Sequence, residues 1–240
     1  MKSKKITSRQ NHNDEFFNQL SEDWWSNDGP FEALHTFNFI RIEYIKKFLK
    51  KNSLNSIDKI KILDVGCGGG ILCEPLARLG AKIIGIDVNE KAIKSAKNHS
   101  FQSNLKIKYH CTDISKFNCK EKFDLITCME VLEHVNDVEL VVKNIKRLLK
   151  KNGIFIGSTI NRTFQSLILA IFVAEKILKL VPQKTHSWEK LVKPNFLKKI
   201  LLSQNFYSIN FQGVSYNPLT KNWKYKESCN INYFFSARAK

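Results

Sequence analysis

The chain has 240 residues, a length typical of one α/β domain, and 43% of them are hydrophobic, which is enough for a sizeable core. Its formal net charge of +17 suits a polyanionic partner, either nucleic acid or an anionic membrane surface. The lysines are spread along the chain, however, as expected if they simply cover the solvent-exposed faces. The six cysteines form no C-x-x-C pair and no zinc spacing, which argues against a zinc module and a disulfide framework and indicates a reduced, intracellular chain.

The N-terminal region is polar and then strongly aromatic. Residues 1–13 are basic and polar without a following apolar segment, so we expect disorder rather than a secretory signal, and a single domain over 14–240. Aromatic side chains are dense over residues 16–39 and include the pair Trp24-Trp25. Such a segment ahead of the first strand either covers a site or packs the apolar face of a helix on the domain.

The central motif is Lys61–Gly70, which reads K-I-L-D-V-G-C-G-G-G and predicts a buried strand that turns into a helix through a glycine loop. A loop with few side chains lets a ligand approach the backbone and the positive end of the helix. Gly66, Gly68 and Gly70 have G-x-G-x-G spacing, and Ile71 stands where a dinucleotide fingerprint needs its third glycine. No G-K-[ST] follows, which excludes a P-loop.

Two acidic residues narrow the class of ligand that the loop could bind. Asp87 ends the next predicted strand, about 20 residues after the loop, where a carboxylate can bind both ribose hydroxyls. Asp64 precedes the glycines, where it would repel a pyrophosphate and suit a positively charged amino group. Together these features resemble the S-adenosylmethionine site of class I methyltransferases. A tight strand-to-helix turn without a ligand is the alternative.

Helices and strands alternate along the rest of the chain. The pattern predicts helices at Arg41–Leu49, Glu90–Asn98 with Asn89 as N-cap, Val138–Lys150 and Lys193–Gln204, and further strands at Ala81–Asp87, Leu105–Cys111, Phe123–Met129, Gly153–Thr159, Tyr207–Tyr216 and Asn232–Ala237. We therefore expect an α/β fold of the Rossmann-like, doubly wound kind, with a mostly parallel seven-stranded sheet and an antiparallel terminal strand. Ligands should lie beyond the carboxyl ends of the strands, where Asp113 is a further, second-rank cofactor candidate.

An apolar insertion interrupts this alternation. Ser166–Val181 is too short and too charged to span a bilayer, and its charges lie toward its second half. It resembles a helix that lies in a membrane interface, although a buried core helix would read similarly. We expect residues 161–190 to form a lid or a membrane contact at the active edge of the sheet.

A second cluster with possible chemistry follows the fourth predicted strand. Glu130, Glu133 and His134 have i, i+3, i+4 spacing, which would place them on one face of a helical turn. Two carboxylates and an imidazole can bind a divalent ion that acts as a Lewis acid on a hydroxyl. Alternatively, the glutamates only favour a helix N-terminus. His35, His134 and His186 could each help a phenol to ionise, and none is assigned as the catalytic base.

The most particular motifs resemble those of the ubiquinone biosynthesis O-methyltransferase family, from about Phe16 to the C-terminus. They are W-W-x-x-x-G-x-F-x-x-L-H (Trp24–His35), L-D-V-G-C-G-G-G-I-L (Leu63–Leu72), T-C-M-E-V-L-E-H-V (Thr127–Val135), S-T-I-N-R (Ser158–Arg162), V-P-x-x-T-H (Val181–His186), Y-N-P (Tyr216–Pro218) and N-Y (Asn232-Tyr233). The family usually has N-P-x-R before its first helix, whereas this chain has Asn38-Phe39-Ile40-Arg41 and so lacks the rigid bend that the proline would give.

The resemblance implies an S-adenosylmethionine-dependent enzyme that methylates catechol-type hydroxyls of polyprenylated phenols and quinols at two steps, 2-polyprenyl-6-hydroxyphenol to its 2-methoxy product and demethylubiquinol to ubiquinol. It implies donor contacts at Arg41, Gly66, Asp87 and Met129, to which the spacing adds Gly68. In the eukaryotic members of the family a Mg2+ site matches Glu130, Glu133 and His134, which makes Mg2+ a second cofactor candidate here.

The resemblance further implies a cytoplasmic protein that lies peripherally on the inner membrane face, contacts membrane lipid and meets other ubiquinone-biosynthesis enzymes. A nucleic-acid methyltransferase is the alternative suggested by the charge, but no RNA-binding module or basic-aromatic patch is apparent. A non-catalytic scaffold is disfavoured because Gly66, Gly68 and Asp87 are intact.

Overall fold

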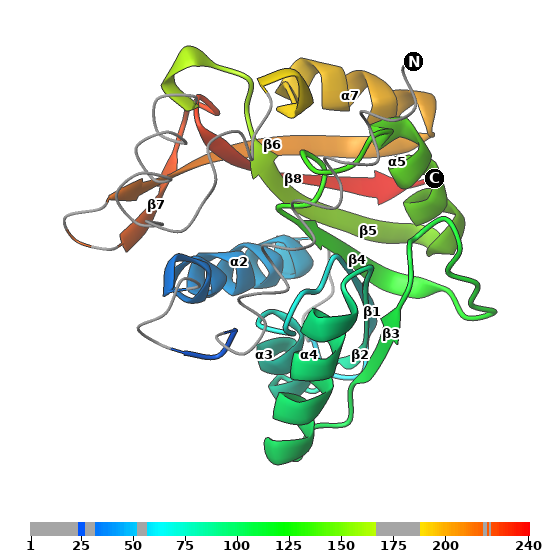
Figure 1. The fold of residues 1–240 in the computed structure, drawn as a ribbon. Helices are drawn as coiled ribbons and strands as arrows, with labels where there is room; N and C mark the ends of the chain where they lie inside the picture. Colours follow the sequence, from blue (N-terminus) through cyan, green and yellow to red (C-terminus); the bar gives the residue numbers. More distant parts are fainter. Residues whose placement is uncertain (1–23, 27–31, 52–56, 167–187, 218–219, 221) are drawn as a thin grey trace, which may run out of the picture.

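The computed structural model describes residues 24–26, 32–51, 57–166, 188–217, 220 and 222–240 (Figure 1). The predicted disordered segment 1–13 and most of the apolar insertion, residues 167–187, lie outside these ranges. In the part that is described, no helix is both long enough and apolar enough to cross a membrane.

A single sheet forms the centre of the domain. Its strands are β1 (Lys61–Val65), β2 (Lys82–Asp87), β3 (Lys108–Cys111), β4 (Phe123–Met129), β5 (Leu149–Ile160), β6 (Phe206–Asn217), β7 (Asn222–Lys226) and β8 (Asn232–Ala239). They lie in the order β3-β2-β1-β4-β5-β8-β6-β7. The strands from β3 to β5 are parallel, whereas β8 is antiparallel to both β5 and β6. The predicted doubly wound fold, with its antiparallel terminal strand, is confirmed.

The sheet has eight strands, not seven, and β7 is the additional one. It forms an antiparallel hairpin with the second half of β6, and the hairpin extends to the left in Figure 1. Trp223 of β7 stacks on Phe37 at a centroid distance of 4.0 Å. The alternation of Trp223 and Tyr225 with polar residues was the local signal for this strand, but what it packs against is a distant helix.

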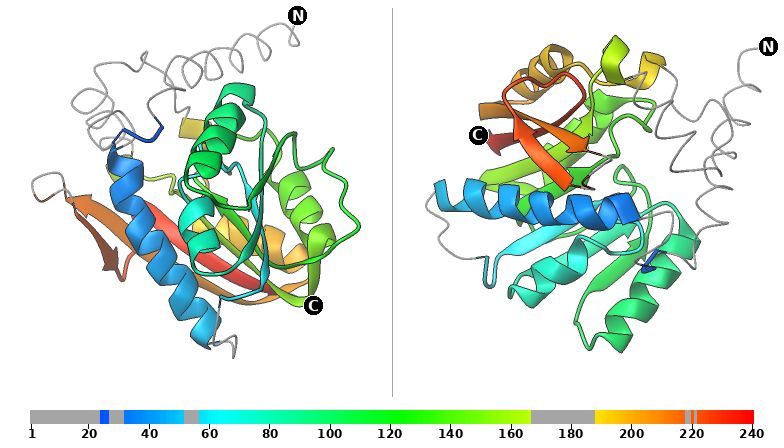
Figure 2. Two further views of the ribbon diagram at one scale, coloured as in Figure 1. Left: turned by 90° about the horizontal axis from the view of Figure 1, so that it is seen from below. Right: turned by 90° about the vertical axis from the view of Figure 1, so that its left-hand side faces the viewer.

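Helices cover both faces of the sheet, as Figures 1 and 2 show. They are α2 (Glu32–Lys51), α3 (Cys73–Arg78), α4 (Glu90–Gln102), α5 (Val138–Leu148), the 3-10 turn η1 (Trp188–Lys190) and α7 (Pro194–Ser203). One apolar cluster joins α2, α3 and α4 to one face, and a second joins α5 and α7 to the other. Successive residues of β1 serve the two clusters in turn, since Ile62 belongs to the first and Leu63 to the second.

The first described helix is longer than the sequence pattern predicted. α2 begins at Glu32, so part of the aromatic segment is helical. Phe37, Ile40, Tyr44 and Phe48 are buried along one side of it, while Phe39 is 78% exposed. This part of the segment therefore packs on the domain as the helical alternative proposed. At α4 the predicted cap is confirmed, because the Asn89 side chain accepts a hydrogen bond from the backbone N–H of Ala92 at 2.9 Å.

The strand register places the carboxyl ends of β1, β2 and β4 next to one another. β1 lies between β2 and β4, and Val65 is level with both Ile86 and Cys128. The residues that follow these strands therefore meet at one edge of the sheet, at its carboxyl end. This edge carries the glycine loop, Asp87 and the segment after Met129, which is where ligands bind in open α/β sheets.

Candidate functional site

The glycine loop follows β1 and is bonded to β2. Gly66 and Cys67 both donate backbone hydrogen bonds to the carbonyl of Ile86, at 2.8 and 3.0 Å. The Asp87 carboxylate accepts a hydrogen bond from the backbone N–H of Gly68 at 2.8 Å. Gly66 and Gly68 have φ angles of +72° and +52°, which a side chain would strain. The loop and Asp87, predicted separately to bind one cofactor, therefore form a single bonded unit.

Protein side chains occupy much of the space beside the glycines. A Cβ at Gly66 would lie 2.2 Å from Cγ2 of Val131, and one at Gly70 would lie 2.4 Å from the hydroxyl oxygen of Tyr109. The sequence analysis explained the missing side chains by a bound ligand, with a tight turn as the alternative. The structure adds that the loop could not pack against β3 and the segment after β4 if these positions carried side chains.

Asp64 is a buried carboxylate directly beneath the loop, with 3% of its surface exposed. It accepts hydrogen bonds from the Thr127 hydroxyl at 2.7 Å and from the Cys73 thiol at 3.3 Å. Burial raises the pKa of Asp64 to about 6, against the opposing effects of these hydrogen bonds and of Arg41. An acid held in this way favours a cationic group nearby.

Arg41 comes from α2 and is buried at the same edge, with 5% of its surface exposed. Burial lowers the pKa of its guanidinium, and the nearby carboxyl groups of Glu130, Asp64 and Glu133 raise it. Its guanidinium carbon lies 4.4 Å from the centre of the Phe37 ring. Arginine stays protonated even when buried, so one fixed positive charge faces three carboxyl groups. Because the carboxyl groups outnumber the guanidinium, the site favours a positively charged ligand.

The segment after β4 has a conformation that the sequence pattern did not predict. Glu130 has a left-handed φ of +55°, and its N–H donates to the carbonyl of Ser158 on β5 at 2.9 Å. A tight turn follows, in which the N–H of His134 donates to the carbonyl of Val131 at 2.9 Å, and α5 begins only at Val138. The shared face of a helical turn expected for these residues is therefore corrected, because pairing of Glu130 with β5 sets a different backbone path.

The side chains of this segment form an acidic pair with a histidine beside it. Burial raises the pKa of both Glu130 and Glu133 to about 7, and the charge of Glu133 contributes to the shift at Glu130. Burial lowers the pKa of His134, which keeps its imidazole neutral at pH 7. Glu133 accepts a hydrogen bond from the Thr159 hydroxyl at 2.7 Å. One oxygen of Glu130 is buried with no hydrogen bond within 3.5 Å in the described part of the chain, and the nearby Ser158 hydroxyl lowers the pKa of Glu130 against the effect of burial.

These residues do not fit the divalent-ion site that the sequence suggested. Within the described ranges, no three His, Cys, Asp or Glu side chains gather as ligands for one ion. The Thr159 hydroxyl already occupies one oxygen of Glu133, and the Arg41 guanidinium supplies positive charge in the same region. The described residues therefore give no support for Mg2+ at Glu130, Glu133 and His134, which are neighbours in an acidic site.

The remaining sequence candidates are placed as follows. Met129 is buried at the end of β4, at the same edge as the glycine loop. Asp113 is exposed just beyond β3, and its side chain accepts a hydrogen bond from the backbone of Ser115 at 2.7 Å. His35 bonds to the carbonyl of Trp24 at 2.8 Å, which is a structural role. His186 lies outside the described residues.

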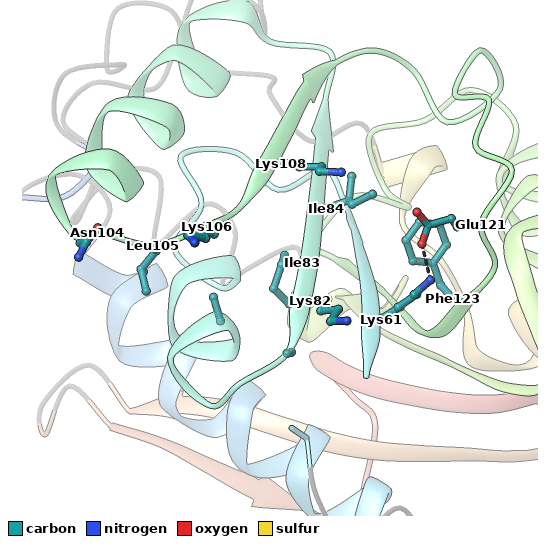
Figure 3. A pocket seen from close by; sticks show the side chains of 12 residues that line it. Lys61, Lys82, Ile83, Ile84, Asn104, Leu105, Lys106, Lys108, Glu121 and Phe123 are labelled. Carbon is teal, nitrogen blue, oxygen red and sulfur yellow. Dashed lines mark hydrogen bonds and ion pairs between the residues drawn. The ribbon is translucent and has the colours of Figure 1, made fainter. Parts of the chain in front are cut away.

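A separate pocket of about 530 Å³ lies at the opposite, amino ends of β1, β2 and β3 (Figure 3). Lys61, Lys82, Lys106 and Lys108 line it, together with apolar residues that include Ile83 and Leu105. Lys61 pairs with Glu121, as the dashed line in Figure 3 shows. The pocket is far from the acidic site along the strands and has the opposite charge, so the two are distinct.

We expect Arg41→Leu to lower the free energy of unfolding by about 3–5 kcal/mol at pH 8, because three buried carboxyl groups would lose their counter-charge. Arg41→Lys keeps a positive charge, so its free energy of unfolding should fall by less. Urea unfolding measures both variants, with Lys46→Leu as the exposed control on the same helix. Equal losses for the leucine and lysine variants would contradict an electrostatic role.

The raised pKa of Asp64 predicts a specific pH dependence. Between the unfolded pKa of about 4 and the folded value of about 6, the native state binds a proton that the unfolded chain has lost, so stability falls as pH rises through this window. Asp64→Asn removes this effect. From pH 4.5 to 7.5, its free energy of unfolding should therefore rise relative to wild type by about 2 kcal/mol, measured by urea titration. Parallel stability curves for the two proteins would refute the assignment.

Comparison with known proteins places this site in a family. A family model described as a methyltransferase domain matches residues 63–157, from β1 to β5. The chain is 44% identical over 224 residues to the ubiquinone biosynthesis O-methyltransferase of Pelagibacter ubique, covering 91% of this chain and 93% of that protein. It is 42% identical over 224 residues to the protein of the same name from Bartonella bacilliformis, with 90% of each chain covered.

Solved structures show the same fold at lower identity. Magnesium protoporphyrin IX methyltransferase from Synechocystis, solved with bound SAH, matches with a TM-score of 0.67 at 20% identity, over 94% of this chain and 97% of that one. A possible histamine N-methyltransferase from Thermotoga maritima matches with a TM-score of 0.67 at 16% identity, over 97% and 100% of the two chains. With its fold shared by methyltransferases and its sequence 44% identical to a curated relative over most of both chains, this chain belongs to the ubiquinone biosynthesis O-methyltransferase family.

Proposed function

We propose that the protein transfers a methyl group from S-adenosylmethionine to catechol-type hydroxyls of polyprenylated ubiquinone precursors. The acceptors would be 2-polyprenyl-6-hydroxyphenol and demethylubiquinol, as in the two steps that the sequence resemblance implies. The observation that carries the proposal is the bonded unit of glycine loop and Asp87 beside an excess of buried acids, on a chain of this family. Such a site binds a ligand with ribose hydroxyls at one end and positive charge at the other.

The donor, when bound, supplies an activated methyl group on a sulfonium. The chain positions it: Asp87 can accept from ribose hydroxyls while it still holds Gly68, because each carboxylate oxygen has more than one lone pair. Asp64 and the acidic pair favour the cationic end. Transfer then depends mainly on an in-line acceptor oxygen and on excluded water, rather than on acid-base groups.

The acceptor hydroxyl must lose a proton, and the segment after β4 can take it. His134 is neutral because burial lowers its pKa, and a carboxyl oxygen of Glu130 is buried close to the same edge. Positioned bases of this kind contribute about 10²–10⁴-fold to a rate. The described residues give no support for a Mg2+ ion in this step.

The apolar insertion supports membrane contact at this edge. Its two ends are tied together, because Val192 donates to the carbonyl of Ile160 at 3.1 Å and Arg162 donates to that of Leu191 at 3.0 Å. The excursion between them, 167–187, therefore starts and returns at the carboxyl end of β5, where a polyprenyl tail would enter. We propose that the protein lies peripherally on the cytoplasmic side of the inner membrane, where it can meet other enzymes of the pathway.

A nucleic-acid methyltransferase remains the alternative suggested by the net charge of +17. The lysine-lined pocket lies at the opposite ends of the strands from the acidic site, so it does not lead nucleic acid toward the proposed methyl donor. Family membership also favours the quinol acceptor.

The first test is product formation. Wild-type protein with methyl-labelled donor and a short-chain demethylubiquinol analogue should give the labelled methoxy product. Asp87→Asn, which retains one carbonyl acceptor for the loop, should raise the donor dissociation constant at least about tenfold, equivalent to 1.4 kcal/mol, in calorimetry. Glu139→Ala, an exposed acid on α5, serves as the control. Labelled RNA instead of a labelled quinol analogue would support the alternative.

The second test concerns lipid. Replacing residues 167–187 with a short glycine-serine linker should abolish flotation with vesicles that contain anionic lipid, while donor binding persists. The linker is feasible because the two ends already lie side by side. Undiminished flotation would refute a lipid role for the insertion.

A further inference from the structure

Trp24 lies flat against the glycine loop. A Cβ on Gly68 would lie 2.6 Å from Cη2 of Trp24, and one on Gly69 would lie 2.6 Å from Cγ of the same side chain. The indole ring thus spans both glycines, and it is only 7% exposed because it also packs with Ile71 and Ala92. Two glycines of the loop leave room for this ring, so at Trp24 the aromatic segment covers the loop, as one of its two expected roles proposed.

Trp25 holds the loop by a different contact. Its indole N–H donates to the carbonyl of Gly69 at 3.0 Å. On the other side of that peptide bond, the N–H of Gly70 donates to the carbonyl of Cys67 at 3.0 Å. The peptide between the two glycines is therefore bonded at both its oxygen and its nitrogen, which fixes a plane that glycines alone would leave free to rotate.

The ring of Trp25 is itself fixed by α4 and α3. It stacks on His99 with a centroid distance of 3.5 Å and an interplanar angle of 3°. His99 Nδ1 lies 2.6 Å from a carboxylate oxygen of Glu74, which is almost fully buried. Glu74, His99 and Trp25 form a continuous chain of contacts that ends on the loop carbonyl.

The same segment joins the loop to α2. The carbonyl of Trp24 is bonded by the His35 ring at 2.8 Å, and the Asn38 side chain donates to the carbonyl of Ile71 at 2.7 Å. One turn after Asn38, α2 carries Arg41 into the acidic site. Movement of this segment would therefore change both the loop backbone and the position of Arg41.

We propose that Trp24 and Trp25, the aromatic strap, are positioning residues of the donor site. Trp24 forms a wall that excludes water from the glycine loop, and Trp25 sets the orientation of the Gly69–Gly70 peptide before the donor arrives. The inference rests on the proposed donor. A loop preorganised in this way binds its ligand more tightly, because less conformational freedom is lost on binding.

The experiment separates positioning from simple stability. Trp25→Phe keeps an aromatic ring to stack on His99 and removes the N–H that binds the Gly69 carbonyl, together with part of the indole surface. Trp24→Leu removes the wall, and Trp24→Phe is its conservative partner. Phe39→Ala and Phe101→Ala, at side chains 78% and 85% exposed on α2 and α4, are matched controls.

Donor binding is measured by calorimetry with S-adenosylhomocysteine, at a temperature where circular dichroism shows every variant folded. We expect about threefold to tenfold weaker binding for Trp25→Phe and at least tenfold for Trp24→Leu, with partial recovery in Trp24→Phe and no change in the controls. The KM for the quinol analogue should change less than twofold. Folded strap variants that bind as tightly as wild type would overturn the proposal.

Hydrogen exchange in the absence of ligand separates a wrong strap proposal from a wrong assignment of the donor. Peptides that cover residues 66–72 should exchange faster in Trp25→Phe than in Phe39→Ala, whether or not a donor binds. Wild-type protein that fails to bind S-adenosylhomocysteine would refute the donor assignment, whereas unchanged exchange in Trp25→Phe would refute the strap.

Discussion

Parallel pairing of β1 with both β2 and β4 is the constraint on which the site depends. Parallel strands that begin at one edge end together at the other, so the residues after Val65, Ile86 and Cys128 have to meet. Asp87 then needs only a local turn to accept the Gly68 amide. The glycine loop is therefore shaped first by its neighbours in the sheet and only second by a ligand.

Buried charged groups determine which ligands the carboxyl edge of the sheet can bind. Burying Asp64, Glu130 and Glu133 around one guanidinium costs free energy, which appears as raised pKa values for all three acids. A protein chain tolerates such a cost where charge is useful, and a cationic ligand would return part of it on binding. The net charge of the whole chain, strongly positive, is opposite in sign to that of its candidate site, which shows how little a global charge says about one pocket.

The glycines illustrate how one pattern can serve two purposes. Read as a motif, G-x-G-x-G indicates a backbone open to a ligand. In the fold, the same positions also admit Val131, Tyr109 and Trp24, which pack where side chains would otherwise stand. The two explanations are compatible, because the backbone atoms that face a ligand need rigid support from behind.

The sequence by itself determined the order of helices and strands, the doubly wound sheet, the loop with its acid at Asp87 and the family, since each is recorded in local periodicity or in residues close along the chain. Tertiary structure decided the rest. β7 packs against α2, Glu130 takes a left-handed conformation through its bond to Ser158, and Arg41 lies among acids that come from other elements. These depend on contacts between residues far apart in the sequence, which no local pattern encodes.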